Sequence, residues 1–317
     1  MNLLSRSIRG SALLLLLMPL LAWANPKILI SVKEAKELLG KPGVRFIFSD
    51  GDKSWVEGHI PGSVHAFAHD IHYLRDVKKC DGLPMCEGVA AKFIGSLGID
   101  SETEVIAYDD GRGSNASGVW FYLKLYGVKK VRMLDGGFVT WKKMGFPVEE
   151  GAGSKVAAKS FKVKVDRSMV ATKSEILVAI KSGGALLLDA RHRLDEYNGK
   201  NLGSALISPG KEITVARGGF IPGAIFSPWT KYAGNKKGKA NKHLFKKESK
   251  LKKQLKKLKK RGFSKDKTVI SYCHVGLGRG TFQYAAMLMA GHTKSKVYVG
   301  SWNEWGNDSS LPLGKMK

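Results

Sequence analysis

A lone cysteine, Cys273, stands between a short β-branched run and a glycine-rich loop that reads Cys273-His-Val-Gly-Leu-Gly-Arg279-Gly280. The thiolate of a cysteine is its nucleophilic form, so a reactive cysteine needs surroundings that stabilise a negative charge. Loop glycines let backbone N–H groups turn toward an anion, and the helix expected from about Thr281 presents its positive end to the loop. Arg279 adds a permanent cation. The pattern predicts a nucleophilic Cys273 in an anion-binding loop; the alternative is a buried core thiol.

The same loop supplies most of the residues that we expect to contact a substrate anion. The loop candidates are His274, Val275, Gly276, Leu277, Gly278, Arg279 and Gly280. Arg191 is a further candidate, because it follows an expected strand at the carboxyl end, where ligands of α/β sheets gather. The alternative for Arg191 is an ion pair with Asp195 or Glu196. We expect no metal and no other cofactor.

Strand-like and helix-like segments alternate through the chain and would position these residues. Such alternation is typical of an α/β fold with mainly parallel sheets flanked by helices. The expected strands span residues 44–49, 104–108, 130–134, 185–190 and 268–272. The expected helices span residues 31–39, 89–97, 116–126 and 174–181.

The two halves of the chain repeat one another. Gly136 follows Asp109 by 27 positions, and Gly300 follows Cys273 by the same 27 positions. This spacing indicates a tandem duplication. Asp109 then takes the place of Cys273 in the first copy, and Asn115 takes the place of Arg279. We therefore expect an inactive first copy and an active second copy.

The expected organisation begins with a cleavable signal peptide. Residues 1–24 combine a basic start, an apolar run and a small-x-small site that ends at Ala24. The alternative, a membrane anchor, is disfavoured because a spanning helix needs about 20 apolar residues. We predict a periplasmic or secreted protein. The predicted boundaries are a signal peptide at 1–24, an inactive domain at 25–150, a linker at 151–168 and a catalytic domain at 169–317.

Two further cysteines, Cys80 and Cys86, lie close together in the first half. In an oxidising compartment they suggest a local disulfide, and the alternative is two buried thiols. Either way Cys273 is left without an obvious partner.

Several motifs together resemble the two-domain rhodanese family of thiosulfate and 3-mercaptopyruvate sulfurtransferases. The residues that carry the resemblance are Ile60-Pro-Gly62, Leu188-Asp-Ala-Arg191, Glu196-Tyr197, Ile221-Pro-Gly223, the Cys273 loop and Gly300-Ser-Trp-Asn-Glu-Trp305. The resemblance implies that Cys273 takes a sulfane sulfur from a small anionic donor such as thiosulfate. A thiophilic acceptor, either cyanide or a thiol, would then remove the sulfur from a covalent persulfide.

The loop departs from the family in its length. Five residues separate Cys273 from Arg279, whereas sulfurtransferases commonly have four. The longer form resembles the loop of cysteine phosphatases, which keeps a phosphatase-like or arsenate-type enzyme as an alternative. A non-catalytic rhodanese-like binding module is a third hypothesis.

The chain carries a formal net charge of +26, and much of it lies in one segment, Lys231–Arg261. Leucines at helical spacing predict an amphipathic helix there, whose apolar stripe packs on the second domain. The basic face is either simply solvated, or attracts an anionic surface or an acidic partner, or steers small anions toward Cys273. We do not expect nucleic acid as a partner of an exported protein.

Overall fold

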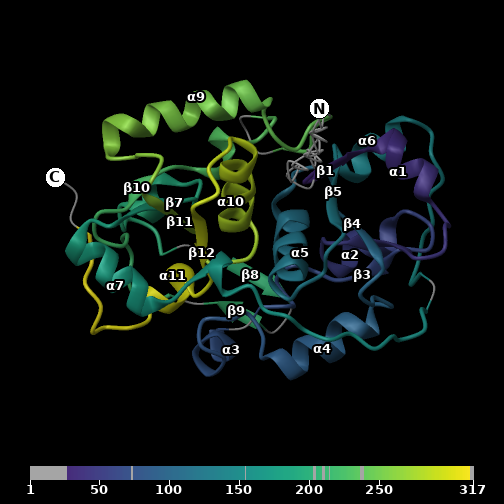
Figure 1. Cartoon of the computed structure of the whole chain (residues 1–317), viewed down its shortest axis with the longest axis horizontal. Helices are drawn as coiled ribbons and strands as arrows, with labels where there is room; N and C mark the ends of the chain where they lie inside the picture. The colour runs from purple at the N-terminus through teal and green to yellow at the C-terminus, as the bar shows by residue number, and fades with distance from the viewer. Residues whose placement is uncertain are drawn as a thin grey trace, which may run out of the picture.

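The computed structural model describes residues 27–314 apart from residues 73, 154, 203–204, 209–210, 214 and 236–238. The predicted signal peptide therefore lies outside the described residues. Within them, the chain forms two α/β halves, each built on a five-stranded sheet (Figure 1). All paired strands of the two sheets run parallel. The predicted fold class is confirmed.

The first half alternates strands and helices. Its strands are β1 (Leu29–Ser31), β2 (Val44–Phe48), β3 (Val64–His65), β4 (Glu104–Tyr108) and β5 (Val131–Asp135). Its helices are α1 (Val32–Leu38), α2 (Asp52–Glu57), α3 (Leu74–Lys79), α4 (Glu87–Ser96), α5 (Ser114–Leu125) and α6 (Gly137–Lys143).

The second half follows the same plan with additions. The strands of its main sheet are β6 (Val170–Ala171), β7 (Ala185–Asp189), β10 (Ile225–Phe226), β11 (Thr268–Tyr272) and β12 (Ser295–Tyr298). An antiparallel hairpin, β8 (Ala205–Ser208) and β9 (Lys211–Ile213), was not expected from the sequence. The helices are α7 (Lys173–Ser182), α8 (Leu194–Tyr197), α9 (Glu248–Leu258), α10 (Arg279–Met289) and α11 (Ser301–Trp305).

The topology of the two sheets supports the predicted duplication. The first sheet has the order β1-β5-β4-β2-β3, and the second has the order β6-β12-β11-β7-β10 when it is followed from its opposite edge. Each strand of one sheet therefore has a counterpart in the other. The first helix of each copy even begins with the same device, a reciprocal capping box formed by Ser31 with Glu34 and by Thr172 with Glu175.

The two halves share a hydrophobic core. Helices α5 and α10 lie side by side at the centre of the molecule (Figure 1). Buried side chains of both helices, among them Trp120, Phe121 and Tyr284, belong to one continuous cluster. Since α5 follows the Asp109 loop and α10 follows the Cys273 loop, this packing fixes the two loops relative to each other.

Helix α9 confirms the amphipathic pattern in the lysine-rich segment. Leu251, Leu255 and Leu258 are buried, and the helix packs on α10. The segment predicted as a linker is held against the first half by backbone hydrogen bonds, which Lys159, Lys164 and Asp166 donate to Gly95, Tyr126 and Leu125. Among the described residues, no helix combines the length and the apolar character needed to cross a membrane.

Candidate active site

Cys273 directly follows β11, at the carboxyl end of the sheet, as the sequence predicted. The side chain is 2% exposed and its thiol is free. The Cys273 N–H donates to Ser301 Oγ at 3.2 Å, and the Cys273 carbonyl accepts from the Trp302 N–H at 3.0 Å. The segment that begins α11 therefore holds the backbone of the candidate nucleophile from one side.

The loop after Cys273 needs its glycines. Gly276 and Gly278 have φ angles of +85° and +119°. A Cβ atom on Gly276 would lie 2.1 Å from the Val299 carbonyl oxygen, so no side chain fits there. Thr281 Oγ1 accepts from the Gly278 N–H at 3.0 Å and thereby caps α10. Val275 and Leu277 have buried side chains, so only their backbone groups can face an anion.

Arg279 is the first residue of α10 and is only partly buried. Within the described parts of the chain it forms neither an ion pair nor a hydrogen bond through its side chain. Burial lowers the pKa values of His69 and His192, and the positive charge of Arg279 lowers them further. Burial raises the pKa of Glu196, and the charge of Arg279 opposes part of that rise. This cation beside a buried thiol is suited to hold an incoming anion.

The first half contributes residues to this site that the sequence analysis missed. A Cβ on Gly278 would lie 3.7 Å from His69 Cε1, and Ser117 Oγ lies 3.1 Å from the Gly278 carbonyl oxygen. His69 Nδ1 is inaccessible to solvent and has no hydrogen-bond partner among the residues that the structure describes. Burial, together with the positive charge of Arg279, lowers the pKa of His69 to about 4. No sequence pattern marks these residues, since they reach the loop only when the two halves pack together.

His274 is buried beside the same groups, since its charge contributes to the lowered pKa of His69. The His274 carbonyl accepts from the Asn303 N–H at 2.8 Å, which anchors the start of the loop. Gly280 lies in the first turn of α10, where a Cβ would be 3.6 Å from the Cys273 nitrogen. The predicted loop residues thus lie together between Cys273 and the first turn of α10.

Arg191 follows the carboxyl end of β7, as predicted, and its guanidinium is held by other residues of the second half. Arg191 is fully buried, and its Nη2 lies 2.6 Å from Asp189 Oδ2 and 2.6 Å from the Gly219 carbonyl oxygen. Arg191 also stacks over the Trp302 ring at 4.8 Å. Its acidic partner is Asp189, not Asp195 or Glu196. These contacts occupy the guanidinium and favour a structural role, while the substrate-binding role of Arg191 stays a prediction.

The equivalent loop of the first half is filled from within. The Asp109 carboxylate accepts backbone N–H groups at 2.9 Å from Gly111 and Gly113, and at 3.2 Å from Asn115 and Ala116. Burial and the charges of nearby acids raise the pKa of Asp109 to about 7. A Cβ on Gly113 would be 2.8 Å from Phe282, which closes the loop from outside. This anion nest has no place for a substrate anion.

The other sequence candidates are cysteines. Cys80 and Cys86 form a disulfide in the structure, which is the first of the two alternatives considered from the sequence. In the described part of the chain, no cluster of His, Cys, Asp and Glu side chains is suited to hold a metal ion.

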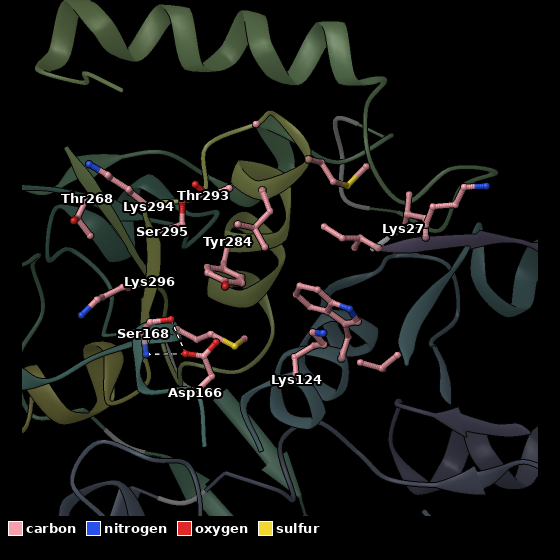
Figure 2. Close-up of a pocket in the computed structure, with 18 of the residues that line it drawn as sticks. Lys27, Lys124, Asp166, Ser168, Thr268, Tyr284, Thr293, Lys294, Ser295 and Lys296 are labelled. Atoms are coloured by element: carbon pink, nitrogen blue, oxygen red, sulfur yellow. Dashed lines mark hydrogen bonds between the residues drawn. The ribbon is translucent and has the colours of Figure 1, made fainter. Parts of the chain in front are cut away.

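A cavity of about 830 Å³ lies between the halves, away from Cys273. Trp120 and Tyr284 line it from α5 and α10, with Lys124 and Lys296 among the charged residues around it (Figure 2). Thr268 and Ser295, which also line it, begin β11 and β12. The cavity is therefore at the amino ends of the strands, whereas Cys273 lies at the carboxyl ends, and the two sites are separate.

Comparison with known proteins agrees with this architecture. A family model described as "Rhodanese-like domain" matches residues 31–144 and again residues 172–308. The chain is 30% identical over 294 residues to a Saccharopolyspora erythraea protein provisionally named a thiosulfate sulfurtransferase, covering 92% of this chain and 97% of that protein. It is 30% identical to the sulfur carrier protein TtuD of Thermus thermophilus, covering 93% and 99% of the two chains.

Solved structures give the same fold. The crystal structure of SseA, a 3-mercaptopyruvate sulfotransferase from Escherichia coli, superposes with a TM-score of 0.69 at 22% identity, covering 87% of this chain and 99% of that one. Wild-type EanB superposes with a TM-score of 0.73 at 21% identity, covering 92% of this chain and 69% of that one. The sequence relatives and the two family matches establish more than the fold: the chain belongs to the rhodanese family and is a sulfurtransferase with two rhodanese-like domains.

Proposed function

We propose that the protein moves a sulfane sulfur from thiosulfate, or from a similar small anion, to a thiophilic acceptor through a persulfide on Cys273. One observation carries the proposal: a buried free thiol lies on a glycine-bent loop that ends in Arg279, a cation with no ion pair among the described residues. The relatives named for thiosulfate and 3-mercaptopyruvate sulfur transfer support the same reaction class.

In the first half-reaction the Cys273 thiolate attacks the outer sulfur of thiosulfate. The sulfur–sulfur bond of the donor breaks, and sulfite leaves with the bonding electron pair. Arg279 and the N-terminal end of α10 would stabilise the sulfonate group and then the persulfide anion. In the second half-reaction cyanide or a thiolate attacks the terminal sulfur. The product is thiocyanate or a new persulfide, and the Cys273 thiolate is regenerated.

Mass spectrometry of the intact protein tests this proposal. Incubation with thiosulfate should add one sulfur atom to Cys273, and cyanide should remove it with release of thiocyanate. Cys273→Ser should take up no sulfur. Sulfur transfer at the wild-type rate by Cys273→Ser would sink the proposal. Hydrolysis of a phosphate ester without sulfur uptake would instead select the phosphatase-like alternative raised by the longer loop.

We further propose that the protein is exported and that the signal peptide is removed after Ala24. The disulfide between Cys80 and Cys86 supports export, because such bonds persist in oxidising compartments. Cell fractionation combined with N-terminal sequencing should find a periplasmic or secreted protein that begins at Asn25. A cytoplasmic protein that retains residues 1–24 would contradict this.

For the lysine-rich segment we propose attraction to an anionic lipid surface. The apolar face of α9 is buried in the protein, so its exposed lysines form a purely electrostatic contact surface. Vesicles containing phosphatidylglycerol should cosediment the protein at low salt, and phosphatidylcholine vesicles should not. Reversing the charge of Lys253, Lys256 and Lys257 should abolish binding, whereas reversing Lys33, Lys36 and Lys41 should not. Salt-dependent kcat/KM without vesicle binding would assign the segment to steering of small anions.

A further inference from the structure

Ser301, the first residue of α11, has an unusual backbone. Its φ angle is +51°, and among the described residues only one other non-glycine residue, Asp81, has a positive φ. Residues other than glycine rarely adopt this left-handed conformation, because their Cβ atom crowds the backbone. Ser301 is fully buried, in contact with the segment that carries Cys273. Strain of this kind is often found where a function depends on it.

The first half, which lacks the cysteine, shows which residue the backbone favours at the position equivalent to Ser301. Gly137 begins α6 at the corresponding place, and its φ angle is +56°. A Cβ on Gly137 would lie 2.5 Å from the Gly111 nitrogen and 2.6 Å from the Asp109 carbonyl oxygen. Glycine therefore suits the backbone at this position, and the second half carries a serine there despite the strain.

The serine hydroxyl makes a contact that glycine cannot make. Ser301 Oγ accepts from the Cys273 N–H at 3.2 Å and donates to the Tyr298 carbonyl oxygen at 2.9 Å. The backbone contacts around it are the same in both halves. The Trp302 N–H donates to the Cys273 carbonyl, just as the Phe138 N–H donates to the Asp109 carbonyl. The hydroxyl bridge distinguishes the half with the thiol from the half without it.

We propose that Ser301 is a positioning residue for Cys273. Its hydroxyl ties the Cys273 N–H to the end of β12 and so fixes the direction in which the thiol leaves the strand. In this orientation Cys273 Sγ lies 3.9 Å from the Gly276 carbonyl oxygen, within its own loop. The inference rests on the proposed role of Cys273 as the nucleophile. It explains the strained backbone at Ser301 as a requirement for positioning that nucleophile.

Two substitutions test the hydroxyl separately from the backbone. Ser301→Gly removes the hydroxyl and the strain together, while Ser301→Ala keeps the strain and removes only the hydroxyl. We expect both to slow alkylation of Cys273 by iodoacetamide about tenfold at neutral pH, the effect of losing roughly one hydrogen bond. Ser301→Gly should nevertheless keep or raise the melting temperature, and its rate–pH profile should move to higher pH. Asp81→Gly relieves backbone strain of the same kind at a residue outside the Cys273 loop and should leave alkylation unchanged.

Alkylation needs no sulfur donor, so the outcome is independent of whether thiosulfate is the substrate. If the wild-type protein takes up no sulfur, the proposed function is overturned. If both Ser301 variants are nevertheless alkylated more slowly, the positioning role is retained. Alkylation of either variant at the wild-type rate would overturn the positioning role. Activity losses that simply follow a lowered melting temperature in Ser301→Gly would do the same.

Discussion

At the scale of single residues, two arginines near the carboxyl ends of neighbouring strands have opposite surroundings. Arg279 keeps its charge available beside Cys273, whereas Arg191 is fully buried against Asp189. Both follow strands of the same parallel sheet, so their sequence positions look equally suited to ligand binding. The difference arises from Asp189, whose carboxylate lies two residues before Arg191 and captures its guanidinium.

Replacing Arg279 should weaken the binding of an anionic donor. For Arg279→Gln we expect kcat/KM for thiosulfate to fall about 10- to 100-fold, the range for a lost charged hydrogen bond. Arg279→Lys should retain part of the activity, because it keeps the charge but loses the planar fork. Steady-state kinetics of sulfur transfer to cyanide measures both. An unchanged KM and kcat in Arg279→Gln would show that the donor binds elsewhere.

Replacing Arg191 should destabilise the fold instead. Arg191→Met leaves the Asp189 carboxylate buried without its cation, which should cost about 3–5 kcal/mol of unfolding free energy. Urea unfolding measures this loss. Under conditions where the variant is fully folded, its alkylation rate at Cys273 should equal that of the wild type. A stable Arg191→Met variant with a raised KM for thiosulfate would support the substrate-binding role that the sequence predicted.

At the scale of elements, one strand–loop–helix unit occurs twice with different contents. In the first half the nest of N–H groups holds the Asp109 carboxylate. In the second half a free Cys273 stands at the equivalent position, where we propose that the donor anion binds. The glycines keep the second loop in the required shape. Since a Cβ on Gly276 would lie only 2.1 Å from the Val299 carbonyl oxygen, the role of this glycine is steric as well as conformational.

Gly276→Ala should therefore damage the site more than an alanine substitution at another glycine with a positive φ would. Gly291 provides the matched control, because its φ is +87° and a Cβ there meets nothing within 4 Å. Gly291→Ala should lose only the backbone term, about 1–2 kcal/mol, with unchanged persulfide formation. Gly276→Ala should be less stable than Gly291→Ala and should form persulfide at least about 100-fold more slowly, as expected for a displaced reacting group. Equal effects of the two substitutions would contradict the steric argument.

The elements were more predictable than their contacts. Strands such as β4 and β11 follow from short β-branched runs, and the spacing from Asp109 to Gly136 indicated the duplication that the sheet orders display. His69 and Ser117 could not be predicted, because they meet the Cys273 loop only after two domains pack together. Ser301 belongs to a motif that carries the family resemblance, but its positioning role could not be predicted, for another reason. Its importance lies in a backbone angle, and the residue type itself favours no left-handed conformation.

At the scale of the whole molecule, each loop is completed by the other half. Phe282 and Leu244 of the second half lie directly against Gly113, so the first loop is closed. His69 and Ser117 of the first half lie against Gly278, so the second loop is braced without being filled. The duplication thus produced two equivalent surfaces with different uses. Because each half contacts the loop of the other, the packing of the two domains should affect both the stability and the activity of the protein.

Acidification should lower the stability of the folded protein through protonation of His69. Its pKa is about 4 in the folded protein, below the ordinary value of 6.5 for a histidine. Above pH 6.5 the imidazole is neutral in both states and folding carries no penalty. As the pH falls from 6.5 toward 4, the unfolded chain binds the proton first, so stability is lost over this window. Melting temperatures of the wild type should therefore drop more steeply between pH 7 and pH 4.5 than those of His69→Gln, which cannot titrate there. The equally steep drop of both proteins would mean that His69 is not held neutral beside Arg279, and that the first half approaches the catalytic loop less closely than the structure places it.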